Sequence, residues 1–288
     1  MEIAERLQQA MGAEKHKDTA QQGSYASSDK LKGKRALITG GDSGIGRAVS
    51  TQFSLEGASV AIVYLPSEED DAQRTKELVE KNGGTVMLIP CDLSHASNCK
   101  DAVTRAVQAL GGIDILVNNA AWKRETGGIE DVTEDQWVKT FRTNIDSYFY
   151  VTKYALPHMP KDGVIVNSAS VDSYIGVPSR IDYAATEGAV VAFTRSLSNQ
   201  LVKRGIRVNA VAAGPVLTPL ISADVGAELK MSTEDQKILH HGLGNWTPMD
   251  RLGRPSEIAP SYVFLAGKES AFMSGQTLHP NGGIVVNG

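Results

Sequence analysis

Seven short apolar runs alternate with helical stretches over most of this chain, and that alternation limits the fold more than any other feature. The apolar runs lie at 34–39, 58–65, 85–90, 113–120, 163–170, 206–214 and 276–283. Helical periodicity occupies 47–57, 68–84, 96–112, 133–159, 183–205 and 254–270. Strands separated by helices of about ten residues or more return to a sheet in parallel. The sequence therefore predicts an α/β fold, a parallel sheet of about seven strands with helices on both faces and right-handed crossovers.

Composition excludes several classes of protein. The net charge is −4, and no block of five Lys or Arg residues occurs, so nucleic acid and membrane surfaces are poor partners. Cys91 and Cys99 are the only cysteines, a pattern that favours a reducing compartment and predicts a cytoplasmic protein. No apolar run approaches the ~18 residues of a membrane span. The six histidines lack metal-ligand spacing, and His240 with His241 is expected on a solvated loop, so no metal is predicted.

The chain is expected to hold one large folded unit with an appended arm. Residues 1–30 are polar and predict an N-terminal arm, either mobile or packed on a neighbouring subunit. Residues 31–288 carry the alternating pattern and predict the catalytic domain. Within it, 217–247 is irregular and rather apolar, which is typical of a substrate lid, although the same residues could pack against another subunit.

A glycine cluster lies between the first strand and the first helix. In "ALITGGDSGIG", Gly40, Gly44 and Gly46 allow a tight turn and a close approach of the backbone to a diphosphate. The helix that follows offers unpaired N–H groups and a partial positive charge to the same anion. Because the cluster opens a series of strands and helices, it predicts a doubly wound Rossmann domain that binds a dinucleotide at the carboxyl ends of its strands.

The end of the second strand usually distinguishes NAD from NADP. An acid there would bind the ribose hydroxyls and repel a 2′-phosphate. Here Tyr64, Leu65 and Pro66 occupy the position, and the acids begin at Glu68. Arg47 could meet a 2′-phosphate or be a surface residue of the helix. The pattern slightly favours NADP over NAD and leaves both open.

Further motifs occur in a fixed order along the chain. They are "TGGDSGIG", Asp92 in "PCDLS", "NNAA" at 118–121, Asn144 in "TNI", Ser170 in "NSAS", "YAATE" from Tyr183, and "AAGPVLTP". In this order and spacing the chain resembles the short-chain dehydrogenase/reductase family over residues 31–285. It is most similar to the N-terminally extended branch described as glucose- or ribitol-dehydrogenase-like.

The resemblance implies specific roles for residues of this chain. The catalytic set of the family is Asn–Ser–Tyr–Lys, and its first three members are matched by Asn144, Ser170 and Tyr183. Ser168 is the alternative hydroxyl near Ser170. The positions expected to bind the cofactor are Gly40, Asp42, Ser43, Gly44, Ile45, Gly46, Tyr64, Leu65, Asp92, Leu93, Asn118, Ala120, Ala121, Tyr183, Gly214, Val216 and Thr218.

The fourth catalytic position departs from the family, because Glu187 replaces the lysine. A carboxylate near Tyr183 would raise the phenol pKa, whereas a cation would lower it. Reduction of a carbonyl needs a protonated phenol and oxidation of an alcohol needs a phenolate, so the glutamate should harm oxidation more. Its oxygens could still accept hydrogen bonds from the cofactor ribose. Two nearby changes, Ala121 and Ala213 in place of the family's glycine and proline, accompany it. The glutamate could also have been introduced deliberately to trap a complex.

Three functions follow from these residues. The first is an NAD(P)H-dependent carbonyl or imine reductase with Tyr183 as acid and Ser170 as polarising group. The second is a non-redox isomerase, cyclase or dehydratase, and the third is a nucleotide-binding pseudoenzyme. Trp122, Tyr174 and Trp246 are expected to contact the substrate, with Lys123 and Arg124 also at the rim, which favours a bulky, partly aromatic small molecule. The resemblance also implies a homotetramer or homodimer built on helices 133–157 and 181–203.

Overall fold

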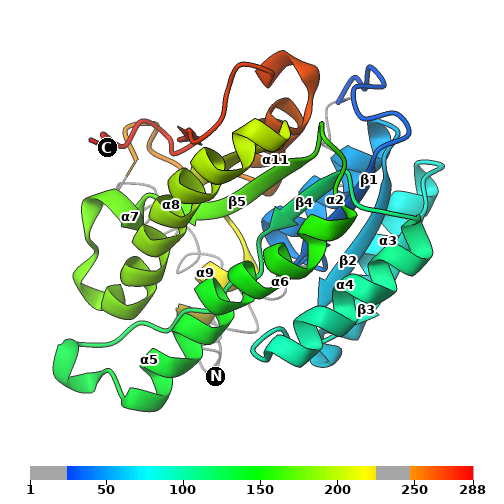
Figure 1. The fold of residues 1–288 in the computed structure, drawn as a ribbon. Helices are drawn as coiled ribbons and strands as arrows, with labels where there is room; N and C mark the ends of the chain where they lie inside the picture. Colours follow the sequence, from blue (N-terminus) through cyan, green and yellow to red (C-terminus); the bar gives the residue numbers. More distant parts are fainter. Residues whose placement is uncertain (1–24, 225–246, 288) are drawn as a thin grey trace.

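The structure is a computed structural model that describes residues 25–224 and 247–287. Its centre is a seven-stranded, fully parallel sheet within these residues (Figure 1). The strands are β1 Arg35–Thr39, β2 Ser59–Tyr64, β3 Val86–Pro90, β4 Ile115–Asn118, β5 Val164–Ser170, β6 Arg207–Ala213 and β7 Thr277–Leu278. Their order is β3-β2-β1-β4-β5-β6-β7. The predicted fold class is therefore confirmed.

Helices connect successive strands. The α-helices are α2 Gly44–Leu55, α3 Glu69–Lys81, α4 Ala96–Leu110, α5 Glu134–Phe141, α6 Ser147–Ala155, α7 Asp172–Ile175, α8 Ile181–Leu201, α9 Pro219–Asp224 and α11 Pro255–Ala266. The 3₁₀ turns are η1 Pro66–Glu68, η2 Ile129–Asp131, η4 Leu156–His158, η5 Pro178–Arg180, η6 Val202–Arg204 and η7 Lys268–Ser270. A single π-helical segment among the described residues, η3 Arg142–Asp146, joins α5 to α6.

Buried apolar clusters fill the space between the sheet and its helices. Successive strand residues point to opposite faces, so Ile38 packs with α2 and α11 while Leu37 packs with α4, α6 and α8. Because both faces are covered, central strands such as β4 are fully buried. This explains why the strand sequences are continuous apolar runs rather than alternating patterns.

The strand order changes direction at β1, where β2 lies on one side and β4 on the other. The loops that leave β1 and β4 therefore separate and leave a crevice at the carboxyl ends of the strands. Gly40 follows β1, Asn119 follows β4, and Ser170 ends the neighbouring strand β5. The topology thus places the predicted cofactor and catalytic residues at one edge of the sheet.

Three elements differ from the sequence prediction. The helix expected over 133–159 is divided by the π turn η3, which a 3.6-residue periodicity does not reveal. The last strand lies within the predicted run 276–283 but has only two residues, Thr277–Leu278. The end of the predicted arm packs on the domain, because the carboxylate of Glu56 accepts hydrogen bonds from Tyr25 Oη at 2.6 Å and from the backbone of Lys30 at 2.8 Å.

Several predictions fall on residues outside the described part of the chain. They concern most of the arm, 1–24, most of the lid, 225–246, and within the lid His240, His241 and Trp246.

Candidate active site

The loop between β1 and α2 has the geometry of a phosphate-binding turn. Gly40 and Gly44 have φ of 63° and 51°, which favours glycine at both positions. A Cβ at Gly46 would overlap the carbonyl oxygen of Gly40, so only glycine fits there. Ser43, the N-cap of α2, makes no side-chain cap, and the first N–H groups of the helix stay directed at the crevice. These residues fit the diphosphate of a dinucleotide.

Residues distant in sequence support this loop. Asn119 Nδ2 donates to the carbonyl oxygens of Thr39 and Gly40 at 3.1 and 3.0 Å, joining the ends of β1 and β4. Thr218 packs on the other side, with its Cγ2 3.0 Å from the position of a Cβ on Gly44. The predicted cofactor segments at 40–46 and 214–218 are therefore brought together.

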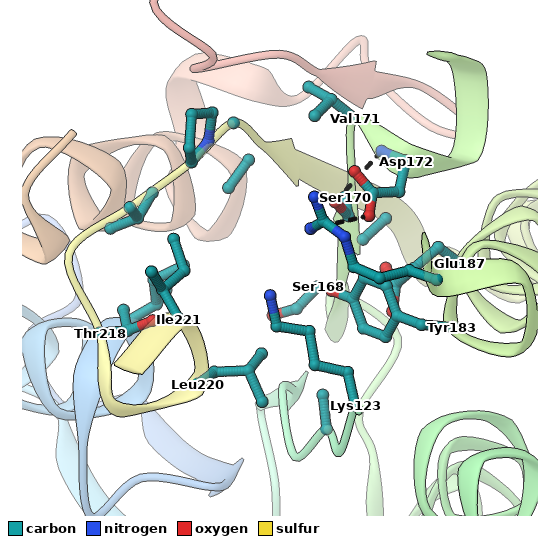
Figure 2. A pocket seen from close by; sticks show the side chains of 18 of the residues that line it. Lys123, Ser168, Ser170, Val171, Asp172, Tyr183, Glu187, Thr218, Leu220 and Ile221 are labelled. Atoms are coloured by element: carbon teal, nitrogen blue, oxygen red, sulfur yellow. Dashed lines mark hydrogen bonds and ion pairs between the residues drawn. The ribbon is translucent and has the colours of Figure 1, made fainter. Parts of the chain in front are cut away.

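A cavity of about 240 Å³ lies beside the glycine loop, where the carboxyl ends of β4, β5 and β6 meet α8 and α9. Figure 2 shows Lys123, Ser170, Asp172 and Tyr183 pointing into it from different elements. Its lining includes these predicted positions: Ile45, Ala121, Ser168, Ser170, Tyr183, Glu187, Gly214, Val216 and Thr218. The structure thus joins the predicted hydroxyls to the predicted cofactor crevice.

Tyr183 and Ser170 form the centre of this cavity. Tyr183 lies in the first turn of α8 and is only 8% exposed, and Ser170 is the last residue of β5. Burial raises the pKa of Tyr183 well above its usual value, the charge of Glu187 raises it further, and hydrogen bonding with Ser170 opposes both effects. The phenol is therefore protonated at neutral pH, which makes it a proton donor rather than a base.

Ser168 is bound in a different network. Its Oγ donates to Asn119 Oδ1 at 3.1 Å and lies 2.7 Å from the hydroxyl of Tyr262. Ser170 Oγ accepts the backbone N–H of Asp172 at 3.1 Å. Ser170 also hydrogen-bonds with the phenol of Tyr183, a contact that Ser168 is not shown to make, and this favours Ser170 as the working hydroxyl.

Glu187 lies one helical turn after Tyr183 and is 3% exposed. Burial raises the pKa of its carboxyl to about 8, and repulsion from Asp172 adds to the rise, while a hydrogen bond with Tyr183 and the charge of Lys123 oppose it. At neutral pH the carboxyl is consequently mostly protonated. The sequence prediction that Tyr183 has a raised pKa holds, but its first cause is burial and not a neighbouring carboxylate.

A second buried acid faces Glu187. Asp172 is 5% exposed and begins α7, two residues after Ser170. Burial also raises the pKa of its carboxyl, and the charges of Arg180 and Lys123 oppose the rise. The Arg180 guanidinium binds Asp172 and Glu125, at 3.2 Å in each case. One wall of the cavity is therefore an ion-paired cluster.

Asn144 serves a neighbouring loop. Its Oδ1 accepts the backbone N–H of Trp122 at 2.8 Å, and its Nδ2 donates to the Trp122 carbonyl at 2.8 Å and to Thr186 Oγ1 at 3.1 Å. The side chain thus holds the loop after β4 against α8 from the π turn η3. Asn144 itself is not part of the described cavity lining.

Other predicted residues lie away from this cavity. Trp122 stacks under Lys139, 4.3 Å from its Nζ, and Tyr174 contacts His279 with ring centroids 4.9 Å apart, and neither lines the described cavity. Asn118 is fully buried and donates to Thr152 and Asn167 beneath the crevice. The remaining cofactor positions, Tyr64, Leu65, Asp92 and Leu93, follow or end β2 and β3, toward the adenosine side expected from the topology.

Sequence reasoning missed several residues of the site. The cavity is also lined by Asn119, Glu125, Asp172, Arg180 and Ile284, whereas Leu220 and Ile221 in its lining belong to the predicted lid. Asp172 and Asn119 could have been found, because each lies within two residues of a strand's carboxyl end. Ile284 carries no such signal, since only the folded chain brings its segment to the cavity.

Neither a metal-binding cluster nor a membrane-spanning helix is found among the described residues. They contain no group of three or more His, Cys, Asp or Glu side chains arranged to hold a metal ion. No helix among them has the length and apolarity needed to cross a membrane.

Comparison with known proteins gives the same assignment as the geometry. A family model described as enoyl-(acyl carrier protein) reductase, of the short-chain alcohol dehydrogenase type, matches residues 40–285. The chain is 48% identical to NADPH-dependent aldehyde reductase 1, chloroplastic, of Arabidopsis thaliana (96% of this chain, 100% of that one). It is 47% identical to glucose and ribitol dehydrogenase of Daucus carota (92% and 89%). A short-chain dehydrogenase from Burkholderia cenocepacia, solved with NADP, superposes with a TM-score of 0.78 at 30% identity (88% and 99%). The chain belongs to the short-chain dehydrogenase/reductase family, whose members are NAD(P)-dependent oxidoreductases.

Proposed function

We propose that this protein is an NADPH-dependent reductase of a carbonyl or imine group on a bulky, partly apolar small molecule. The observation that carries the proposal is the position of Ser170 and Tyr183, side by side in a cavity next to the glycine loop. Burial keeps the Tyr183 phenol protonated, because it raises the phenol pKa, and a protonated phenol suits reduction.

Different residues would bind the cofactor, polarise the substrate, donate the proton and exclude water. The glycine loop and the N-terminus of α2 would hold the diphosphate, with Gly214, Val216 and Thr218 beside the nicotinamide, whose reduced form supplies a hydride. Ser170 donates a hydrogen bond that polarises the substrate's C=O or C=N group. Tyr183 donates its proton to the substrate heteroatom as the new C–H bond forms. The apolar wall, including Ile175, Leu220 and Ile221, excludes water from the reacting atoms.

The preference for NADPH over NADH rests on the end of β2. Residues 64–67 contain no carboxylate there, and Tyr64 Oη donates to Glu69 at 2.6 Å, which holds that acid within α3. Arg47 does not supply a ready 2′-phosphate ligand, since its guanidinium binds Asp71 at 2.8 Å and the Asp42 carbonyl at 2.6 Å. The relative from Arabidopsis named as NADPH-dependent and the Burkholderia complex with NADP support the same preference.

Loss of NADPH absorbance tests the proposal. Aromatic and branched aldehydes, ketones and cyclic imines would be compared with glucose and ribitol, and each active substrate repeated with NADH. We expect turnover of the apolar carbonyls or imines and a higher kcat/KM with NADPH. Absence of NADPH oxidation across the panel, from protein shown to bind NADPH, would refute the reductase assignment.

A non-redox reaction is the second candidate, and the facing carboxyls of Asp172 and Glu187 favour it. Burial raises the pKa of both carboxyls, and with a pKa of about 8 Glu187 could exchange a proton with a substrate near neutral pH. An isomerase, cyclase or dehydratase would form product without consuming NADPH. Product analysis by mass spectrometry alongside the absorbance assay separates the two reactions.

We also propose a homodimer or homotetramer formed through α5, α6 and α8. Trp137, Val138 and Phe149 are at least 40% exposed on α5 and α6, an unusual number of large apolar side chains for a solvated surface. Light scattering after size-exclusion chromatography would give the mass of the assembly. A monomer at micromolar concentration would contradict this proposal and leave the catalytic one intact.

A further inference from the structure

The acidic side chains around the cavity oppose the charge that a reduction creates. As a carbonyl accepts hydride, negative charge develops on its oxygen. Three acids, Glu125, Asp172 and Glu187, line the same cavity, and any that is ionised opposes that charge. The Arg180 guanidinium is bound to two of them, Glu125 and Asp172, on one wall of the cavity.

Lys123 is the other cation that lines the described cavity. Its side chain comes from the loop after β4 and is 7% exposed, although lysine is rarely buried to this extent. The Nζ lies 5.8 Å from the centroid of the Tyr183 ring. Figure 2 shows the ammonium and the phenol entering the cavity side by side. Burial raises the pKa of Asp172 and of Glu187, and the charge of Lys123 opposes both rises, so the ammonium acts on both buried acids.

The backbone that carries Lys123 is held in place. Asn144 pairs with both the N–H and the C=O of Trp122, the preceding residue, at 2.8 Å each. Its amide also reaches Thr186, whose hydroxyl donates to the carbonyl of Tyr183 at 2.8 Å. The loop and the first turn of α8 therefore form one hydrogen-bonded unit. A lysine on a held backbone loses less conformational freedom when its ammonium is used.

We propose that Lys123 is a further catalytic residue, which contacts the substrate oxygen beside Tyr183 and Ser170 and stabilises the negative charge that forms on it. The proposal rests on the reductase function proposed above. In the step, hydride from the reduced nicotinamide forms the new C–H bond and the C=O π electrons move to oxygen. The Tyr183 proton forms the O–H bond, and solvent restores that proton. Lys123 keeps its own proton and acts through its charge.

Because the phenol is buried, a cation beside the substrate oxygen contributes more to stabilising the transition state. A weak acid transfers its proton late, so the substrate oxygen carries more negative charge in the transition state. In a cavity with little water, one well-placed donor to a developing oxyanion contributes about 10²-fold or more to kcat. Lys123 enters from the β4 loop, on a different element from Glu187, and can act although position 187 holds an acid.

The first experiment compares Lys123→Met, Lys123→Arg and Lys139→Met. Lys139 is exposed, stacks on Trp122 and does not line the cavity, so it is a matched charge control. With benzaldehyde and acetophenone as substrates, we expect kcat to fall about 10²-fold in Lys123→Met and less in Lys123→Arg. NADPH affinity should change less than about twofold, because the glycine loop is untouched. Adding Glu187→Lys to Lys123→Met should restore at least about tenfold of the lost kcat, since it returns an ammonium to the phenol.

A second readout does not depend on turnover. Benzoate carries a charged oxygen like that of the reacting substrate, and its binding to the NADPH-saturated protein can be followed by calorimetry. We expect Lys123→Met to weaken benzoate binding at least about tenfold and Lys139→Met to leave it unchanged. Equal benzoate affinity in the parent and Lys123→Met, or equal kcat, would overturn the role of Lys123. Failure of the parent to oxidise NADPH with any substrate would overturn the reductase function instead, and the benzoate result would still decide whether Lys123 binds an oxyanion.

Discussion

At the residue scale, the protonation of the Tyr183–Glu187 pair is the basis for the proposed direction of the reaction. Both side chains are buried, and burial is the first cause of the raised pKa of each. At neutral pH a neutral carboxyl therefore faces a neutral phenol. Such a pair suits proton donation and hydrogen bonding to the cofactor ribose, whereas formation of a phenolate for alcohol oxidation is costly.

Replacing Glu187 with lysine should increase the rate of alcohol oxidation. A cation beside the phenol lowers the Tyr183 pKa, and each unit corresponds to about 1.4 kcal/mol. We expect Glu187→Lys to raise the rate of NADP⁺-dependent alcohol oxidation at least about tenfold at pH 8, measured by the appearance of NADPH. Glu187→Gln is the control, because it removes the acid without adding a cation. If Glu187→Lys binds NADP⁺ and oxidises no faster than Glu187→Gln, the missing cation does not limit oxidation.

The same carboxyl should make stability fall as pH rises. The pKa of Glu187 is about 8 in the folded chain and about 4.5 when unfolded, so the folded state holds the proton more tightly. The stability contributed by protonation is complete below pH 4.5 and is lost progressively as pH rises to 8. Glu187→Gln should therefore have the higher Tm at pH 9, while the difference shrinks at pH 5. Differential scanning fluorimetry without nucleotide measures the Tm of the parent and of Glu187→Gln at each pH. A Tm difference that stays constant from pH 5 to pH 9 would show that Glu187 does not titrate in this range.

At the element scale, the π turn η3 between α5 and α6 links two parts of the site. A π turn shifts the register of the helix by one residue, and here it places Asn144 against the loop after β4. The amide satisfies both backbone groups of Trp122. Asn144 thus positions the loop that carries Lys123 and does not itself line the described cavity.

Asn144→Ala should uncouple this loop from α8. It removes the side-chain partner of the part-buried N–H and C=O groups of Trp122, at a cost of about 1–3 kcal/mol in the free energy of unfolding. We expect kcat to fall with NADPH affinity nearly unchanged, and Asn144→Asp to retain the contact to the Trp122 N–H alone and to lose less. Denaturant unfolding and fluorescence titration with NADPH measure the two effects. Loss of NADPH binding with kcat retained would place Asn144 in the cofactor site instead.

The turn from β1 to α2 depends on a glycine that no other residue can replace. In Gly46→Ala the new methyl group would overlap the Gly40 carbonyl oxygen, and the loop must shift. We expect NADPH binding to weaken at least about tenfold, or 1.4 kcal/mol. Gly188→Ala is the matched control, because a Cβ at this position in α8 meets open space and alanine favours the helix by up to about 1 kcal/mol. Equal NADPH affinity in both variants would show that the close approach is not needed.

At the scale of the whole molecule, the domain continues before its first strand. The Glu56 carboxylate is fully buried and accepts hydrogen bonds from Tyr25, Ser28 and Lys30. Lys30 also pairs with Glu269 at 3.0 Å. Residues 25–30 therefore satisfy a buried charge between α2 and β2 and belong structurally to the domain, although their polarity predicts an arm.

Two truncations test this boundary. A chain starting at residue 31 leaves the Glu56 carboxylate buried without these three donors, and one starting at residue 25 keeps them. Because an unpaired buried charge is strongly destabilising, we expect the shorter chain to melt roughly 5 °C or more below the longer one. Adding Glu56→Gln should recover part of the difference. Identical melting of the two truncated chains would show that this contact contributes no stability.

The sequence by itself determined the layers, the parallel sheet of about seven strands and the glycine turn. These features are local, since they depend on periodicity and on backbone freedom at single positions. The resemblance of its motifs to those of the short-chain dehydrogenase/reductase family indicated Ser170, Tyr183 and Glu187. Only the tertiary structure decided that Glu187 is neutral at pH 7, because its pKa depends on burial and on Asp172. The placement of Arg180, Ile284 and the Lys123 loop at the cavity was likewise decided there, since the sheet topology brings these distant segments together.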